Sequence, residues 1–378
     1  MHFAPVLLAA WIGTWASSPV QAGEDVSFQG DTLREIVHVS IGGSSVRVRF
    51  TNRFGNSPLV ISDATIAVES GGTASALAGS LHDLTFMGAS SVTIPPNADV
   101  YSDAATLQVP PKSNLLVSMY LPDAAPLATE HQLTNQTNYY AQGEHSSDVS
   151  GAAFSHTYTP WYFIDGVDVS ASGARGAIVA FGDSITDGAG GEKNANDRWP
   201  DFLASRLQTL PPSRQLGVLN AGISGNRILL SSKPFGIDAL ARMDSDVLSQ
   251  SSAADVIVLL GINDIQQTPH QYDASQIELG LQQIVEQAHA RGLRAIGCTI
   301  TPYEGWLFYD TRGEATRQAV NEWIRRSGTF DAVVDFDAAV RDPSDPHRLL
   351  PAYDSGDHLH PNAAGHRVMA NTVNLSAL

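Results

Sequence analysis

The pattern of apolar and polar positions divides the chain into two unlike halves. From about residue 24 to residue 170, short segments of alternating polarity are separated by Gly, Pro, Asn and Asp, and no helical period appears. Such segments are typical of strands with one buried face, and their spacing suits a β-sandwich. The strands expected in this half are residues 34–41, 45–51, 59–68, 91–94, 106–109, 115–121 and 161–169.

The clearest pair of these strands flanks two consecutive glycines. Residues 34–41 and 45–51 alternate apolar and polar positions on either side of Gly42 and Gly43. A two-residue glycine turn is typical of a tight hairpin, because glycine adopts positive φ without steric cost. We therefore expect the two strands to pair with each other.

After about residue 174 the pattern becomes strand, helix, strand. Continuous apolar runs, as expected for strands buried on both faces, occupy residues 177–181, 216–221, 256–260, 293–300 and 332–336. Segments with a helical period separate or follow them at residues 199–210, 237–249, 275–291, 314–326 and 362–373. This alternation predicts an α/β domain with a parallel sheet covered by helices on both faces. We place an all-β, sandwich-like domain at residues 24–172 and the α/β domain at residues 173–378.

Residues 1–23 fit two interpretations. Phe3 to Ile12 is an apolar stretch, and Val20-Gln21-Ala22 resembles a signal-peptide cleavage site, although no Lys or Arg precedes the stretch. Trp11 to Trp15 fits the first strand of the folded protein equally well. The signal interpretation predicts a secreted or periplasmic protein. Elsewhere no run approaches the roughly 18 apolar residues of a membrane-spanning helix, so we expect no stable membrane insertion.

The composition of the chain excludes several classes of binding partner and of chemical site. A chain of 378 residues with 43% hydrophobic and 16% charged residues is typical of a globular protein with two domains. A net charge of −17 and only three lysines argue against nucleic acid and anionic membrane surfaces as partners. The single cysteine, Cys298, excludes an internal disulfide and a cysteine-rich metal site.

The candidate nucleophile follows the first strand of the α/β half. Ser184 lies in Gly182-Asp183-Ser184-Ile185, just beyond the expected strand end, where open α/β sheets carry their catalytic groups. A serine hydroxyl needs a neighbouring base, and the base needs an orienting acid. His360 and Asp357 stand three residues apart in one loop near the carboxyl terminus. We therefore predict a catalytic triad of Ser184, Asp357 and His360.

Two further loops contain suitable donors for an oxyanion. Residues 220–226 and 261–264 follow the second and third strands of the α/β half. The first loop contains Gly225, whose backbone N–H is open to approach, and the second contains the side-chain amide of Asn263. Together with the N–H of Ser184, these groups predict an oxyanion hole with three donors.

These four loops, in this order, resemble the conserved blocks of the SGNH hydrolases, also called GDSL esterases and lipases. The resemblance assigns the roles of nucleophile, oxyanion donors, acid and base to Ser184, Gly225, Asn263, Asp357 and His360. It also implies a flavodoxin-like, three-layer α/β/α domain with strand order 2-1-3-4-5, and it implies no cofactor. An ordinary α/β-hydrolase fits less well, because its nucleophile elbow needs glycine where this chain has Thr186.

A finer resemblance points to the xylan-esterase-like branch of that family. Residues 178–188, 198–200, 219–227 and 353–361 are similar to that branch. Its members often carry an amino-terminal β domain that begins near a Trp-x-Gly-Thr-Trp stretch, which here is Trp11 to Trp15. The resemblance therefore favours the strand interpretation of that stretch.

Other residues near the expected strand ends are candidates for substrate contact. Tyr303, Glu304 and Trp306 belong to an aromatic segment after the fourth strand, where they either stand at the rim of the site or pack against the β domain. Arg227 follows the glycine donor and either contacts a substrate or forms a surface salt bridge. His358 and His360 lack a nearby carboxylate cluster, so we predict no metal site.

Two hypotheses of different classes follow. The first is a serine esterase that releases short acyl groups, such as acetyl, from carbohydrates or from small aryl or alkyl esters through an acyl-enzyme intermediate. The second is a carbohydrate-binding protein with an inactive hydrolase-like domain. The presence of all five predicted parts favours the esterase. The natural substrate and the oligomeric state stay open at this point.

Overall fold

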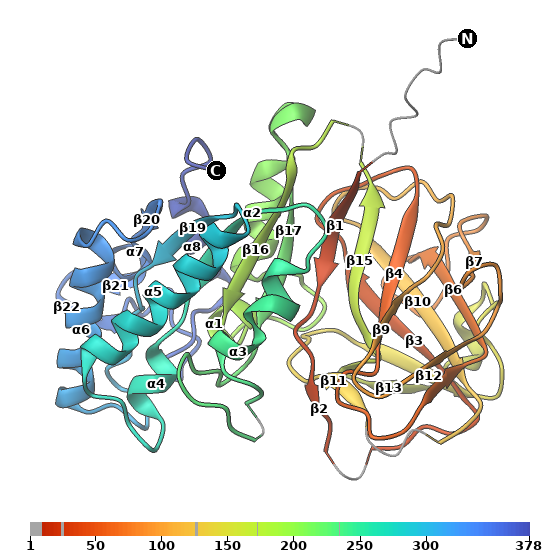
Figure 1. Cartoon of the computed structure of the whole chain (residues 1–378), viewed down its shortest axis with the longest axis horizontal. Helices are drawn as coiled ribbons and strands as arrows, with labels where there is room; N and C mark the ends of the chain where they lie inside the picture. The colour runs from red at the N-terminus through yellow and green to blue at the C-terminus, as the bar shows by residue number, and fades with distance from the viewer. Residues whose placement is uncertain (1–9, 24–25, 125–127, 172, 234) are drawn as a thin grey trace.

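The computed structural model describes residues 10–23, 26–124, 128–171, 173–233 and 235–378. It shows two halves side by side, an all-β half formed by the first part of the chain and an α/β half formed by the rest (Figure 1). Most of the predicted apolar stretch before Trp11, and residue 172 at the predicted domain boundary, lie outside the described residues.

The β half is built from antiparallel strands. Its two larger sheets have the strand orders β1-β15-β4-β9 and β13-β12-β3-β10-β6-β7, and side chains from both sheets share one core. The strands are β1 (Trp11–Ala16), β2 (Val20–Gln21), β3 (Asp31–His38), β4 (Val46–Thr51), β5 (Leu59–Ile61), β6 (Asp63–Val68), β7 (His82–Leu84), β8 (Val92–Ile94), β9 (Asp99–Tyr101), β10 (Asn114–Leu121), β11 (Thr129–His131), β12 (Asn138–Gln142), β13 (His156–Tyr158), β14 (Trp161–Tyr162) and β15 (Ile164–Ser170).

The predicted hairpin around Gly42 and Gly43 is wrong. β3 pairs with β10 and β12 in one sheet, whereas β4 pairs with β15 and β9 in the other. Neither glycine has a positive φ. A Cβ on Gly42 would lie 2.3 Å from the carbonyl oxygen of Val109, so glycine is required here for close backbone approach and not for a turn. The chain crosses from one sheet to the other at this point.

The other strand predictions in this half need smaller corrections. The segment 59–68 forms two strands, because β5 pairs with β8 while β6 pairs with β10 and β7. The segment 106–109 forms no strand, although Ala105 and Val109 make isolated bridges to Val46 and Gly43. Local polarity therefore located the extended segments but did not show which sheet each one joins.

The α/β half contains a five-stranded parallel sheet. Its strands are β16 (Gly176–Gly182), β17 (Leu216–Gly222), β18 (Ala253–Leu259), β19 (Arg294–Cys298) and β20 (Ala332–Val334). The observed order β17-β16-β18-β19-β20 is the expected order 2-1-3-4-5. Ala177, Val179 and Phe181 of β16 join one core, whereas Ile178 and Ala180 join the other. This alternation shows that both faces of the sheet are buried.

Helices cover the two faces of this sheet. On one face lie α3 (Ala239–Met243), α5 (Ala274–Ala290) and α6 (Thr311–Arg326), and on the other lie α2 (Trp199–Leu207), α7 (Phe336–Val340) and α8 (Ala363–Thr372). The short helices α1 (Ser184–Asp187) and α4 (Ile262–Gln266) begin just after β16 and β18, and β21 (Arg341–Asp342) and β22 (Asp345–Leu349) form a small hairpin. The predicted three-layer α/β/α fold preceded by an all-β region is confirmed.

Strand β1 joins the two halves. It pairs with β15 in the β half, and its Gly13 N–H donates a hydrogen bond of 3.0 Å to the carbonyl oxygen of Ser251 in the α/β half. A Cβ on Gly13 would lie 2.7 Å from Leu219 Cδ1 on β17, so the two strands are in close contact. One apolar core runs through both halves without a break. Residues Trp11–Ala16 are therefore part of the folded structure.

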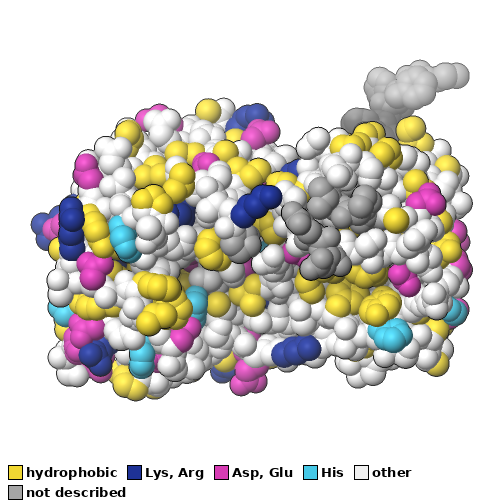
Figure 2. Space-filling view, turned by 90° about the horizontal axis from the view of Figure 1, so that it is seen from below, with side chains coloured by type: hydrophobic (Ala, Val, Ile, Leu, Met, Phe, Trp, Pro, Cys, Tyr) yellow, Lys and Arg dark blue, Asp and Glu magenta, His cyan; other side chains and the backbone are white. Residues whose placement is uncertain are grey.

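Charged side chains of both signs are scattered over the face of the molecule in Figure 2. Figure 2 looks at the molecule from below the view of Figure 1, and its described surface shows scattered basic side chains among acidic and hydrophobic ones. Within the described ranges, no helix combines the length and the hydropathy needed to cross a bilayer.

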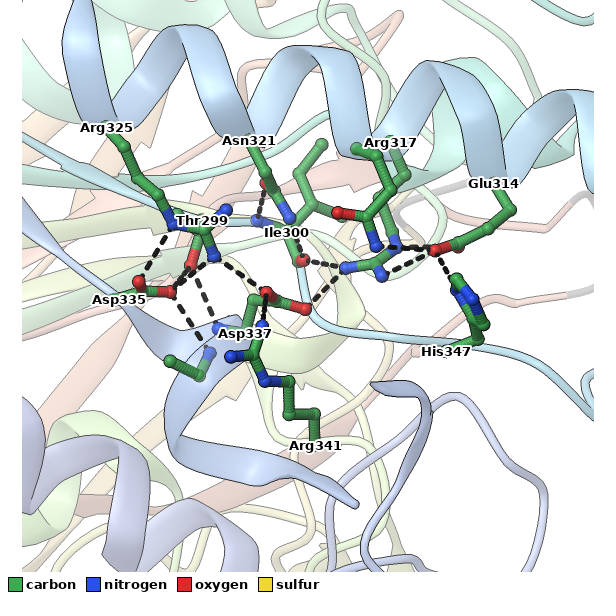
Figure 3. A network of polar contacts seen from close by, with 12 residues as sticks. Thr299, Ile300, Glu314, Arg317, Asn321, Arg325, Asp335, Asp337, Arg341 and His347 are labelled. Carbon is green, nitrogen blue, oxygen red and sulfur yellow. Dashed lines mark hydrogen bonds and ion pairs between the residues drawn. The ribbon is translucent and has the colours of Figure 1, made fainter. Parts of the chain in front are cut away.

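A buried ionic network lies between α6 and α7 in the α/β half (Figure 3). Asp337 at the start of α7 is fully buried and accepts hydrogen bonds from Arg317 at 2.7 Å, Arg325 at 2.7 Å and Arg341 at 3.2 Å. Arg317 is also buried, and it donates to Glu314 and to the carbonyl oxygen of Ile300, both at 2.8 Å. The network ties α6 to α7 and to the end of β19.

We expect Asp337→Ala to lower the free energy of unfolding by about 3–5 kcal/mol, because it leaves the buried Arg317 guanidinium without a carboxylate on one side. Urea denaturation followed by circular dichroism measures this loss. The matched control is Glu322→Ala, which removes an exposed carboxylate that pairs with Arg326 on the same helix and should change stability little. Equal stabilities of the two variants would contradict a stabilising role for the network.

Candidate active site

The carboxyl ends of the parallel strands bring the predicted catalytic groups together. Ser184 follows β16, Gly225 follows β17, Asn263 follows β18, and His360 lies in the loop before α8. These four residues line one pocket. Loops separated by up to 176 positions in the chain meet there because parallel strands all end at the same edge of the sheet.

Ser184 is the first residue of α1, so the turn from strand to helix determines its position. The side chain of Asp183 caps this helix by accepting a hydrogen bond of 3.1 Å from the N–H of Ile185. Burial raises the pKa of the Asp183 carboxyl to about 7. Asp183 therefore shapes the turn, while the adjacent Ser184 faces the pocket.

Ser184, His360 and Asp357 form a continuous series of hydrogen bonds. Ser184 Oγ lies 2.8 Å from His360 Nε2, and His360 Nδ1 lies 2.6 Å from Asp357 Oδ2. The other oxygen, Asp357 Oδ1, accepts hydrogen bonds of 2.9 Å from the backbone N–H groups of Leu359 and His360. The spacing of three residues between acid and base thus closes a small loop that orients the imidazole.

The same contacts determine the charge of Asp357 and the tautomer of His360. Burial alone would raise the pKa of the Asp357 carboxyl, but hydrogen bonds from the His360 ring and from two backbone N–H groups hold it well below its usual range. Asp357 is therefore ionised at neutral pH and accepts the hydrogen on His360 Nδ1. This tautomer leaves the lone pair of Nε2 directed at the Ser184 hydroxyl, as a general base requires.

Gly225 and Asn263 occupy loops that are hydrogen-bonded to each other. The Asn263 Nδ2 atom donates to the carbonyl oxygen of Asn226 at 3.1 Å, and Asn263 Oδ1 accepts from Gln266 at 2.8 Å and from Gln267 at 3.0 Å. Gln267 Nε2 also donates to the carbonyl oxygen of Gly225 at 2.9 Å. These contacts fix the orientation of the Asn263 amide and leave its second N–H available to the pocket.

Position 225 requires glycine for two reasons. Its φ is +76°, in the left-handed region, and a Cβ at this position would lie 2.3 Å from a ring carbon of Phe235. Phe235 itself lines the pocket. The close packing of this ring against Gly225 holds the loop with its backbone at the pocket wall.

The pocket has a volume of about 640 Å³ and a largely apolar wall. Leu133 from the β half contributes to it, so both halves of the chain form the site. The other apolar side chains that line it are Ala189, Phe235, Trp306, Phe308 and Leu359, and the polar ones other than the predicted groups are Ser224, Ser232, Lys233, Gln266, Gln267 and Thr268. Sequence reasoning missed Leu133, which follows a short strand of the β half and has no local signal.

Of the four predicted substrate-contact residues, only Trp306 lines the pocket. Its ring lies edge-on to His360 at 5.9 Å, and its Nε1 donates to Gln266 Oε1 at 2.6 Å. The aromatic segment turns here, because the N–H of Trp306 donates to the carbonyl oxygen of Tyr303 at 3.0 Å. Tyr303 and Glu304, which precede Trp306 in this turn, do not line the pocket.

The other three residues predicted to contact substrate do not line this pocket. Tyr303 is completely buried and packs against Tyr309, and Glu304 pairs with Arg348 at 2.9 Å. Arg227 is also buried, which rules out the surface salt bridge, and it donates to the carbonyl oxygen of Pro269 at 2.6 Å. Arg227 thus links the loop after β17 to the segment after α4, and Glu304 links the loop after β19 to β22.

Two further residues that flank the catalytic groups have structural contacts. Asp264 accepts hydrogen bonds from the N–H groups of Ile228 and Leu229 at 2.8 and 3.1 Å, and burial raises the pKa of its carboxyl to about 6. His358 pairs with Asp354 at 2.6 Å. No group of three or more His, Cys, Asp or Glu side chains suited to a metal ion occurs in the part of the chain that the structure describes.

The fold and the site define an ester hydrolase of the SGNH class, and comparison with known proteins agrees. The family model described as GDSL-like Lipase/Acylhydrolase matches residues 180–368, which is half of the chain. The chain belongs to this family, and it is an esterase. The match begins within β16, so residues 1–179, including the whole β half, lie outside it.

Each of three similar proteins covers about half of the chain. An acetylxylan esterase from Geobacillus stearothermophilus is 27% identical over 221 residues, which are 52% of this chain and 92% of the relative. A solved structure of a putative lipolytic protein of the G-D-S-L family from Desulfitobacterium hafniense has a TM-score of 0.42 at 22% identity, covering 53% of this chain and 99% of that one. The native aryl esterase of M. smegmatis has a TM-score of 0.41 at 17% identity, with coverages of 52% and 94%.

Proposed function

We propose that this esterase hydrolyses carboxylic esters of short acyl groups through an acyl-enzyme intermediate on Ser184. The observation that carries the proposal is the hydrogen-bonded series from Ser184 through His360 to Asp357. Ser184 and His360 line a pocket that Gly225 and Asn263 also line. A hydroxyl, a base and an ionised acid at these distances form the arrangement that activates serine.

The reaction begins with attack of Ser184 Oγ on the ester carbonyl carbon while His360 Nε2 takes the hydroxyl proton. The carbonyl oxygen becomes an oxyanion, which accepts hydrogen bonds from the N–H groups of Ser184 and Gly225 and from Asn263 Nδ2. When the tetrahedral intermediate breaks down, His360 gives its proton to the departing alcohol. Ser184 then carries the acyl group as an ester.

Water completes the cycle by the same route. His360 takes a proton from the water as its oxygen attacks the acyl carbon, and the three donors again stabilise the oxyanion. Breakdown of the second intermediate returns the proton to Ser184 Oγ and releases the carboxylic acid. Asp357 stays ionised throughout and stabilises the imidazolium form of His360 in both halves of the cycle.

The proposed substrates are acetyl esters of carbohydrates and small aryl or alkyl esters. The relative named acetylxylan esterase supports the acetyl group and the sugar. The apolar wall of the pocket, with Trp306 and Phe308, supports aryl and alkyl alcohols, since such rings pack against flat apolar groups. The hypothesis of an inactive hydrolase-like domain has no support, because every predicted catalytic part is present and the family is one of acylhydrolases.

Hydrolysis of p-nitrophenyl esters, from acetate to octanoate, tests the proposal beside release of acetate from acetylated xylan. We expect kcat/KM to be highest for the acetate and to fall with acyl length, and we expect Ser184→Ala to show only the uncatalysed rate. Comparable rates for the wild type and Ser184→Ala would contradict the mechanism. A maximum at octanoate would contradict the short acyl group while leaving the triad intact.

A further inference from the structure

A buried histidine of the β half contacts the catalytic loops of the α/β half. His131, the last residue of β11, is only 5% exposed, and its Nε2 lies 2.8 Å from Asp187 Oδ1. Asp187 ends α1, three residues after Ser184. Its other oxygen accepts hydrogen bonds from the Ser224 N–H at 3.0 Å and from the Ser224 hydroxyl at 2.9 Å. Ser224 directly precedes Gly225, so this series ends at an oxyanion donor.

Both ring nitrogens of His131 face oxygen atoms that only accept hydrogen bonds. Nδ1 lies 2.8 Å from the carbonyl oxygen of Ser18, and Nε2 faces the Asp187 carboxylate and, at 3.3 Å, the carbonyl oxygen of Leu133. Both nitrogens therefore carry hydrogen, and the ring is an imidazolium paired with Asp187. Burial lowers the pKa of His131, but the Asp187 charge and these hydrogen bonds outweigh burial and raise it.

The residue on the other side of Gly225 is held in a similar way. Arg242 Nε donates to Asn226 Oδ1 at 2.9 Å, and Arg242 also donates to the carbonyl oxygen of Gly182 at 2.8 Å and to the Ser18 hydroxyl at 3.1 Å. Ser18 therefore contacts His131 through its backbone and Arg242 through its side chain. Both neighbours of Gly225 are linked to one short segment of the β half.

We propose that His131 is a positioning residue: through Asp187 and Ser224 it sets where the N–H of Gly225 lies relative to Ser184. The β half is then a working part of the catalytic site. This inference rests on the proposed function. Without the imidazolium, the carboxylate of Asp187, only 3% exposed, loses the hydrogen bond from His131 to its Oδ1 and is free to rotate. Rotation of this carboxylate moves Ser224, which donates to its Oδ2, and a donor displaced by about 1 Å lowers turnover by up to about 100-fold.

Two substitutions separate the two contacts of His131. The amide of His131→Asn stands near the place of Nδ1 and keeps the contact to Ser18, whereas the longer amide of His131→Gln reaches toward Asp187. We expect His131→Asn to lower kcat for p-nitrophenyl acetate by roughly 10- to 100-fold with little change in KM, and His131→Gln to restore part of the loss. The matched control is His145→Gln, which breaks another His–Asp pair of the β half, 2.9 Å to Asp148, and should keep the wild-type kcat.

Affinity for trifluoroacetone provides a second readout. Its carbonyl carbon bonds to Ser184 Oγ, the hydroxyl proton passes to His360, and the ketone oxygen becomes an oxyanion. If His131 positions a donor to that oxygen, the affinity falls in His131→Asn by about the same factor as kcat/KM. A double-mutant cycle with Asp187→Asn completes the test, because two residues that act through one link lose less together than the product of their separate losses.

The outcomes are distinct. A wild-type kcat in folded His131→Asn, with only its melting temperature lowered, shows that His131 merely holds the two halves together and overturns the positioning role. The positioning role is also overturned if the loss of kcat in the His131→Asn, Asp187→Asn double variant equals the product of the two single losses. Circular dichroism checks that all three variants of this cycle are folded. Ser184→Ala is measured beside them. Activity in Ser184→Ala contradicts the proposed function itself, whereas an inactive Ser184→Ala beside an active His131→Asn contradicts only this inference.

Discussion

Replacement of His360 by alanine is expected to lower kcat/KM for p-nitrophenyl acetate by a factor of roughly 10⁴ to 10⁶. His360 Nε2 contacts the Ser184 hydroxyl at 2.8 Å, and no other ring nitrogen contacts that hydroxyl among the residues that the structure describes. Without this base the serine keeps its proton, and the alcohol leaves without an acid. Initial rates at several substrate concentrations measure the loss.

Two further variants test whether the loss is specific to His360 and whether Asp357 orients its ring. Asp357→Asn should keep more activity than His360→Ala, because an orienting acid is less costly to remove than the base itself. His358→Ala, in the same loop but paired with Asp354, should stay close to the wild type. An unchanged kcat/KM in Asp357→Asn would show that the carboxylate, 2.6 Å from Nδ1, does not orient the ring.

Asn263→Ala should lower kcat by roughly 100- to 1,000-fold and change KM much less. The reason is that the charge which Asn263 Nδ2 stabilises is present in the transition state and nearly absent in the bound ester. The hydrogen bonds from Gln266 and Gln267 to Asn263 Oδ1 already fix the amide before substrate arrives, so its donor needs no reorganisation. Steady-state kinetics with p-nitrophenyl acetate separates the two parameters.

Asn263→Asp is the matched control for the size of this side chain. It keeps the shape of asparagine but replaces the donor by an oxygen that only accepts, so its kcat should be as low as that of the alanine variant. If either variant instead raises KM and leaves kcat unchanged, Asn263 binds the ester in its ground state and is not an oxyanion donor.

Much of the α/β half follows from local patterns. The apolar runs are buried on both faces, and such strands are recognisable without knowledge of their partners. The sequence predicts Ser184, Gly225 and Asn263 as site residues because each lies within a few residues of the end of one of these runs. It predicts Asp357 beside His360 because a spacing of three residues keeps both in one loop. The strand order came from the resemblance to the SGNH hydrolases and was confirmed.

The errors arose where one local pattern is compatible with two structures. Gly42 and Gly43 satisfy the composition of a tight turn, yet they serve close contact with Val109 where the chain changes sheets. Tyr303 and Trp306 are both aromatic and lie three residues apart, but a turn between them buries one and places the other in the pocket. Polarity and spacing carry no information about such contacts.

For this protein, therefore, the order of residues alone was sufficient to identify the strand-end loops of the α/β half and the chemical groups that they carry. These features depend on periodicity and on neighbours within a few positions. The tertiary structure was needed to show which β strands pair. It was also needed to show that Leu133 of the β half lines the pocket and that His131 of the same half contacts Asp187. Those contacts join residues far apart in the chain, and their free energy depends on the surface that each side chain meets after folding.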